Sequence, residues 1–148
     1  LRCLVGSEMC IRDRYIMIHC AATRADMDIG AADIDRWHRQ RGWRKIGYHY
    51  VIRRNGEVET GRDMDAVGAH CKGMNDKSVS ICLVGGLDEH NKAENNFTKE
   101  QWDALEKLVW QCKLPYADAE VVGHNEFSDK ECPCFDVREW WSNQKATS

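Results

Sequence analysis

Residues 46–59 read Ile46-Gly47-Tyr48-His49-Tyr50-Val51-Ile52-Arg53-Arg54-Asn55-Gly56-Glu57-Val58-Glu59. The first seven alternate and are rich in β-branched and aromatic side chains, which is typical of a strand. Asn55-Gly56 is a preferred dipeptide of two-residue hairpin turns. We therefore expect the chain to reverse here into Glu57-Val58-Glu59, which places one antiparallel strand pair in the sheet.

The segments on either side of this hairpin alternate between strands and helices. Short apolar runs at residues 15–21, 78–84 and 119–123 predict buried strands. Helices are expected over residues 30–41, from Thr98 onward and from about Asp136 onward. Together these elements predict an α/β fold, with a mixed central β-sheet flanked by helices.

Local signals predict how these helices begin and which sides they bury. Asp28 is a candidate N-cap for the first helix. Thr98 and Gln101 have the spacing of a capping box at the second, and Glu139 is placed for a reciprocal cap at the third. The second helix carries an apolar stripe at three- and four-residue spacing, formed by Trp102, Leu105, Val109 and Cys112.

The chain is expected to form one domain. Its 148 residues suffice for a single hydrophobic core, and we assign that domain to residues 15–143, with a frayed tail at residues 144–148. Residues 1–14 show neither helical nor strand periodicity and resemble translated sequencing-adapter sequence. They are expected to be a non-native lead or a poorly ordered N-terminal arm, so Cys3 and Cys10 are given no role.

Composition excludes several classes of function. A net charge of −3 provides no basic surface for a polyanion, so nucleic acid is not expected as the main substrate. No apolar run approaches the roughly 18 residues that span a bilayer, and the first residues lack the pattern of a signal peptide. Nothing in the composition suggests more than a monomer.

The eight cysteines do not have the distribution of a disulfide framework. Cys20 and Cys82 fall within predicted strands, and Cys112 falls on a helix face. Buried free cysteine is common in protein cores. Without an export signal, reduced thiols are the favoured interpretation.

Three residues that favour zinc lie where predicted elements run into loops. His19 ends the first strand, His124 follows the strand at residues 119–123, and Cys132 lies eight residues later beside Pro133. Two imidazoles and a thiolate leave the fourth position of a tetrahedral zinc site open for water, as in catalytic sites. The spacing matches no short zinc-finger pattern, so the prediction of a zinc hydrolase rests on the residue types and not on their spacing.

Residues 18–141 resemble the type-2 N-acetylmuramoyl-L-alanine amidase family, and are closest to the small amidases of T-odd coliphages. The resemblance rests on these segments: Ile18-His19-Cys20-Ala21-Ala22-Thr23, Trp37-His38, Gly47-Tyr48-His49-Tyr50, Glu59-Thr60-Gly61-Arg62-Asp63, Ala66-Val67-Gly68-Ala69-His70, Ile81-Cys82-Leu83-Val84-Gly85-Gly86, His124-Asn125-Glu126, Lys130-Glu131-Cys132-Pro133 and Phe135-Asp136. It implies an amidase/peptidoglycan recognition protein-like fold.

The resemblance also assigns roles at matching positions. It implies one Zn²⁺ bound by His19, His124 and Cys132, with Tyr48 and Lys130 as the essential catalytic residues. Lys130 would place its ammonium near the oxygen that gains charge when the lactyl carbonyl is attacked.

The remaining polar candidates have less specific interpretations. His70 lies in a glycine-bounded loop and is a candidate for lining the substrate groove. His49, which should face away from Tyr48, and His38 are expected to be structural, and His90 exposed. Cys134 is expected to be a bystander. Glu126 could act as a base, but a supporting role is favoured.

The expected function is hydrolysis of the bond between N-acetylmuramic acid and L-alanine in peptidoglycan by a phage-type endolysin. Such a protein would be made in the host cytoplasm and reach the cell wall during lysis. A cytosolic recycling amidase fits the resemblance less well. Two alternatives remain: a peptidoglycan-binding module without catalysis, which usually lacks the cysteine ligand, and an additional partnership with a phage RNA polymerase, which the resemblance suggests.

Overall fold

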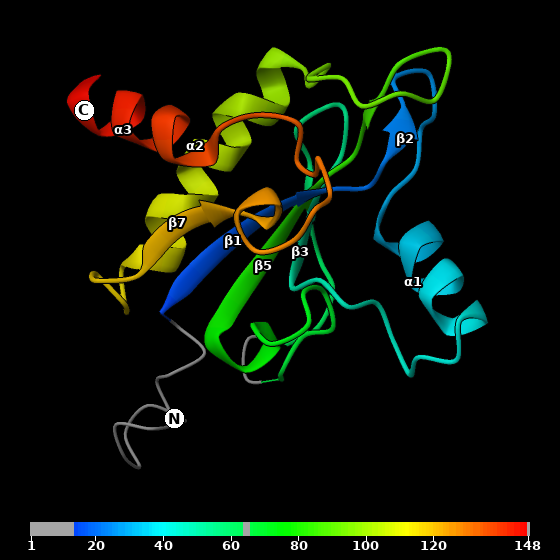
Figure 1. Cartoon of the computed structure of the whole chain (residues 1–148), viewed down its shortest axis with the longest axis horizontal. Helices are drawn as coiled ribbons and strands as arrows, with labels where there is room; N and C mark the ends of the chain where they lie inside the picture. Colours follow the sequence, from blue (N-terminus) through cyan, green and yellow to red (C-terminus); the bar gives the residue numbers. More distant parts are fainter. Residues whose placement is uncertain (1–13, 64–65, 148) are drawn as a thin grey trace.

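The computed structural model describes residues 14–63 and 66–147, which form a five-stranded mixed sheet with helices on both faces and a separate two-stranded sheet (Figure 1). The strand order is β4-β3-β5-β1-β7. The bounds are Tyr15–Cys20 for β1, Tyr50–Ile52 for β3, Val58–Thr60 for β4, Ser78–Leu83 for β5 and Glu120–Gly123 for β7. Only β3 and β4 pair antiparallel within this sheet, so the predicted fold class is confirmed.

The hairpin at Asn55-Gly56 forms as predicted, but its first strand is shorter than the sequence pattern suggests. Gly56 takes a φ of 90°, which glycine adopts at little cost. Residues 46–49 do not belong to β3 because some of their N–H groups bond elsewhere. Those of Ile46 and Gly47 donate to Asp35 Oδ1 at 2.8 Å and His38 Nδ1 at 2.9 Å. The first helix therefore fixes the start of this segment, whereas the N–H of His49 donates to the Ser80 carbonyl of β5 at 3.1 Å.

The two faces of the sheet bury different partners. α2 (Lys99–Lys113) and α3 (Val137–Thr147) cover one face, where they pack on Ile16, Ile18 and Cys20 of β1. α1 (Ala31–Gln40) lies on the opposite face, and so does the segment 66–77, which contacts Met17 through Cys71 (Figure 1). Because both faces of β1 are covered, Ile16 to Cys20 are all buried, as a parallel strand inside a sheet requires.

The start of α1 differs from the prediction. Asp28 is not its N-cap, because the Asp28 carboxylate instead accepts from the Arg53 guanidinium at 2.9 Å. The N-cap is Gly30, whose N–H donates to the Asp33 carboxylate at 3.1 Å. The next N–H, of Ala31, donates to Glu59 of β4 at 2.8 Å. The helix start is thus tied to the hairpin.

The predicted capping box of α2 is confirmed, since the Thr98 hydroxyl accepts from the Gln101 N–H and the Gln101 side chain accepts from the Thr98 N–H. The predicted apolar stripe was wrong in part. Trp102 is only partly buried, whereas Gln101 and Leu108 are buried. A glutamine can occupy the core here because its amide also donates to the carbonyls of Ile52 and Val84, which satisfies its buried polar atoms.

Gln101→Ala is expected to lower the free energy of unfolding by about 2–3 kcal/mol. The change removes half of the capping box, several buried hydrogen bonds and side-chain volume, and buried groups that lose a partner cost about 1–3 kcal/mol. Urea unfolding at one fixed zinc concentration measures it. Lys107→Ala on the exposed side of the same helix is the control, with an expected change within about 0.5 kcal/mol. Equal effects of the two changes would contradict the bridging role of Gln101.

The remaining elements are short. Gly86 does more than stop β5, because it begins β6 (Gly86–Leu87), which pairs with β2 (Thr23–Arg24). The segment 66–77 contains a single helical turn, η3 (Asn75–Lys77), and η4 (His124–Glu126) follows β7. α3 is helical to Thr147, beyond the position where the sequence predicts fraying.

In the described ranges, no helix has the length and apolar character needed to cross a membrane. The predicted lead lies outside the described residues except for Arg14.

Candidate metal centre and groove

The register of parallel strands brings the two predicted histidine ligands together. β1 and β7 are neighbours, and Ile18 is paired with Gly123. His19 and His124 each follow one member of this pair, so they leave the same edge of the sheet at the same level. Their ring centroids are 4.6 Å apart, and both side chains are buried.

Cys132 reaches this edge from the loop that follows η4. Its Sγ lies 3.9 Å from Nδ1 of His19, and the backbone N–H of Cys20 donates to the sulfur at 3.1 Å. An N–H group directed at a sulfur is a contact that orients metal-binding thiolates. The loop is therefore docked on the end of β1 at the position where the third ligand is needed.

The three predicted ligands form one cluster. Single ligand atoms from His19, His124 and Cys132 all lie within 4.8 Å of one another, and no other such group occurs among residues 14–63 and 66–147. Burial, followed by the charges of neighbouring groups, lowers the pKa of His19 well below its ordinary value. Burial and Lys130 lower the pKa of His124 in the same direction. Both rings are thus neutral near pH 7, which leaves a nitrogen lone pair for a metal.

A groove opens beside the cluster. Its inner part has a volume of about 190 Å³ and is lined by Cys132, Ile34 and Trp37 among others. Its outer part, about 530 Å³, extends along residues 69–75, which include Lys72. Both parts share five lining residues: His38, Arg41, Tyr48, His124 and Lys130. The cluster is therefore reached through a continuous groove that carries several basic side chains.

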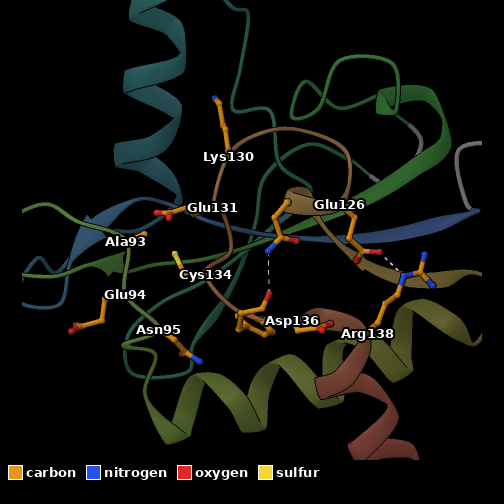
Figure 2. A pocket seen from close by; sticks show the side chains of 11 residues that line it. Ala93, Glu94, Asn95, Glu126, Lys130, Glu131, Cys134, Asp136 and Arg138 are labelled. Atoms are coloured by element: carbon orange, nitrogen blue, oxygen red, sulfur yellow. Dashed lines mark hydrogen bonds and ion pairs between the residues drawn. The ribbon is translucent and has the colours of Figure 1, made fainter.

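The two predicted catalytic residues lie in this groove. The Tyr48 ring is 5.1 Å from the His19 ring, centroid to centroid, and burial, with smaller contributions from nearby cysteines, raises the pKa of its phenol well above the ordinary value. Tyr48 thus keeps its proton near neutral pH. Lys130 lies on the exposed loop two residues before Cys132, and in Figure 2 its side chain extends away from Glu126 and Asp136.

A second pocket, of about 730 Å³, lies on the other side of this loop (Figure 2). Cys134 lines it, and its Sγ is 3.9 Å from Cys20 Sγ and 3.4 Å from the Gly86 carbonyl. Cys134 is not a member of the metal-ligand cluster. Glu126 accepts from the Gly123 N–H at 2.7 Å and pairs with Arg138. Glu126 thus has a supporting role, because it fixes the backbone just before His124.

The other histidines divide as the sequence predicts. His49 is buried, and its ring contacts Ser80 Oγ at 3.1 Å and the Ala66 carbonyl at 2.8 Å. His38 lies on α1, where it is buried and lines the groove, and His90 is exposed. His70 lines the outer groove, while its contact with substrate stays a prediction.

Sequence reasoning missed a contact on the inner side of His70. His70 Nδ1 is 2.8 Å from His19 Nε2, and burial, with nearby positive groups, lowers the pKa of His70 to about 3. It also missed Arg41 and Lys72 as groove residues. A charged surface residue gives no sequence signal that distinguishes a groove wall from open surface.

Comparisons with known proteins agree with this geometry. The sequence model of the family described as N-acetylmuramoyl-L-alanine amidase matches residues 11–135. The endolysin of Klebsiella phage KP32 is 48% identical over 134 residues, which cover 90% of this chain and 89% of that protein. The endolysin of Escherichia phage T7 is 42% identical over 134 residues, which cover 90% of this chain and 89% of that protein. The N-acetylmuramoyl-L-alanine amidase LysC of Clostridium intestinale URNW superimposes with a TM-score of 0.77 at 28% identity, covering 90% of this chain and 85% of LysC.

Proposed function

The chain belongs to the N-acetylmuramoyl-L-alanine amidase family, and we propose that it hydrolyses the N-acetylmuramic acid to L-alanine bond as a phage-type endolysin that depends on one zinc ion. The observation that carries the proposal is the convergence of His19, His124 and Cys132 beside a groove. Similarity to endolysins over nine-tenths of both chains supports the same activity.

The donor set fits zinc. Zinc–nitrogen bonds of about 2.0 Å and zinc–sulfur bonds of about 2.3 Å place tetrahedral ligands roughly 3.6 Å apart. Cys132 Sγ and His19 Nδ1 are 3.9 Å apart, and all three ligand atoms lie within 4.8 Å of one another, so the side chains would move closer together when they bind the ion. Two neutral imidazoles and one thiolate supply three of four ligands, as in catalytic zinc sites.

The reaction adds water across the amide. The oxygen bonds to the lactyl carbonyl carbon, the carbon–nitrogen bond breaks, and the alanine nitrogen leaves after taking up a proton. A zinc ion bound here supplies acidity, since it lowers the pKa of a coordinated water to about 7. The ammonium of Lys130 stabilises the negative charge that develops on the carbonyl oxygen. Tyr48, which is protonated and lines the groove, would donate a hydrogen bond that orients the attacking water.

The groove suits a peptide-bearing glycan. Arg41 and Lys72 lie on its walls with Lys130, and basic side chains pair with the free carboxylates of stem peptides. The sugar ring would occupy the opposite, more apolar end near Trp37 and Ile34. We therefore propose peptidoglycan as the partner, with synthesis in the host cytoplasm and action at the cell wall after the membrane is opened.

A binding module without catalysis is the second candidate, and the residues argue against it. Such a module needs the groove but not the cysteine ligand, the lysine or the tyrosine. This chain has Cys132, Lys130 and Tyr48 together around one opening. Retention of the whole set is expected only where turnover is required.

Product analysis of purified peptidoglycan tests the function. An amidase releases peptides with new alanine amino termini and creates no new reducing sugar ends. Removal of zinc with a chelator is expected to abolish release, and one equivalent of added zinc should restore it. New reducing ends would identify a glycosidase instead. Release at the full rate from metal-free protein would exclude the zinc mechanism.

A further inference from the structure

The ring of His19 has polar contacts at both nitrogens, and only one of them faces the metal-ligand cluster. Nδ1 faces Cys132 Sγ, while Nε2 lies 2.8 Å from Nδ1 of His70. We propose that His70 and Ser78 form a positioning relay that holds His19 in the tautomer with Nδ1 free of hydrogen, ready for zinc. The inference rests on the proposed zinc site and assigns to His70 a role beyond lining the groove.

The direction of each hydrogen bond in the relay follows from the Met74 carbonyl, with which the Ser78 hydroxyl is in contact. The carbonyl oxygen of Met74 can only accept, so the Ser78 hydroxyl donates its one hydrogen to it, at 2.8 Å. Ser78 Oγ must then accept from His70 Nε2, at 3.0 Å. A neutral imidazole carries one N–H, so Nδ1 of His70 is bare and accepts from His19.

The hydrogen bond between His19 and His70 determines which nitrogen of His19 is free to bind a metal. Because His19 donates from Nε2, its neutral ring has no hydrogen on Nδ1, and the lone pair of Nδ1 faces Cys132 Sγ in the cluster. The opposite tautomer would place two bare nitrogens against each other at 2.8 Å, which is repulsive. The protein thus selects the ligand atom before any ion binds, as hydrogen bonds to metal-binding histidines commonly do.

The relay is anchored to rigid parts of the fold. Ser78 is the first residue of β5, fully buried and paired with Tyr15 of β1. The backbone N–H groups of His70 and Cys71 both donate to the Asn75 side chain, at 2.8 and 2.9 Å. The His70 ring stands at 86° to the His19 ring, so its edge nitrogen meets Nε2. The sheet and η3 therefore fix the orientation of His19.

The strand that carries Ser78 also provides a matched control. Ser80 lies two residues along β5, is equally buried, and its hydroxyl also contacts a histidine ring, that of His49. The two ring nitrogens of His49 contact Ser80 Oγ and the Ala66 carbonyl, and His49 is not one of the three clustered ligands. Ser78→Ala and Ser80→Ala therefore remove the same group from similar surroundings, but only the first breaks the relay.

Two measurements that do not depend on activity test the relay. Zinc affinity is measured by competition with a chromogenic chelator, and the ring tautomer of His19 by ¹⁵N NMR of the zinc-free protein. We expect wild-type His19 to be protonated at Nε2. His70→Phe keeps a ring but no acceptor, and should weaken zinc binding by about 10- to 100-fold and mix the two tautomers. His70→Asn places an oxygen near the lost acceptor and should recover most of the affinity.

Ser78→Ala should weaken zinc binding by a smaller factor, up to about 10-fold, and Ser80→Ala by less than about twofold. A folded His70→Phe protein with wild-type zinc affinity, or wild-type His19 protonated at Nδ1, would overturn the relay. If His70→Phe does not fold, the wild-type tautomer and the two serine variants decide. Wild-type protein that binds no zinc would instead overturn the metal assignment of the proposed function.

Discussion

Cys132→Ser is expected to lower bound zinc from about one equivalent per chain to a small fraction, and amidase activity by at least about 1,000-fold. The change removes the only sulfur ligand of the cluster and leaves a hydroxyl, which is a much poorer ligand for zinc. His19 and His124 alone cannot complete the site. Metal analysis of the purified protein and peptide release from peptidoglycan provide the two readouts.

Cys134→Ser is the matched control for this experiment. Cys134 lies two residues away on the same loop, but its sulfur faces Cys20 and Gly86. The variant should retain about one zinc and activity within about threefold of wild type. Loss of zinc from Cys134→Ser with zinc retained in Cys132→Ser would reverse the assignment of the ligand.

Lys130→Ala is expected to lower kcat by about 100- to 1,000-fold with zinc content unchanged. Lys130 adjoins the ligands in the inner groove but is not one of them. Its ammonium acts when charge develops on the carbonyl oxygen, so the loss should fall on kcat more than on KM. Steady-state kinetics with a soluble muropeptide separates the two constants.

Lys72→Ala distinguishes this role from general attraction of an acidic substrate. Lys72 is also exposed and lines the outer groove, but it does not line the inner part beside the ligands. Its loss should raise KM by a few-fold and leave kcat nearly unchanged, because an exposed pair contributes only about 0.2–1 kcal/mol. An equal fall in kcat for both variants would contradict a specific role of Lys130.

The fold could be predicted largely from local patterns. Apolar runs identified β1, β5 and β7, Asn55-Gly56 identified the hairpin, and Thr98 with Gln101 identified the start of α2. These signals are local because periodicity and turn chemistry depend on neighbouring residues. The errors fell where distant residues compete. Asp28 pairs with Arg53 instead of capping α1, and α1 side chains bind the backbone before β3.

The site also contains residues that the sequence identified and contacts that only the fold shows. The residue types and the family resemblance identified His19, His124 and Cys132, and the structure brings them together. The sequence could not predict that His70 and Ser78 stand behind His19, because the contact joins residues 51 positions apart through the packing of a loop on β5. The amino-acid sequence by itself thus determined which chemical groups are present and which helices, strands and loops carry them. Tertiary structure alone decided which nitrogen of His19 faces the cluster, since strand register and loop docking set the ring's neighbours.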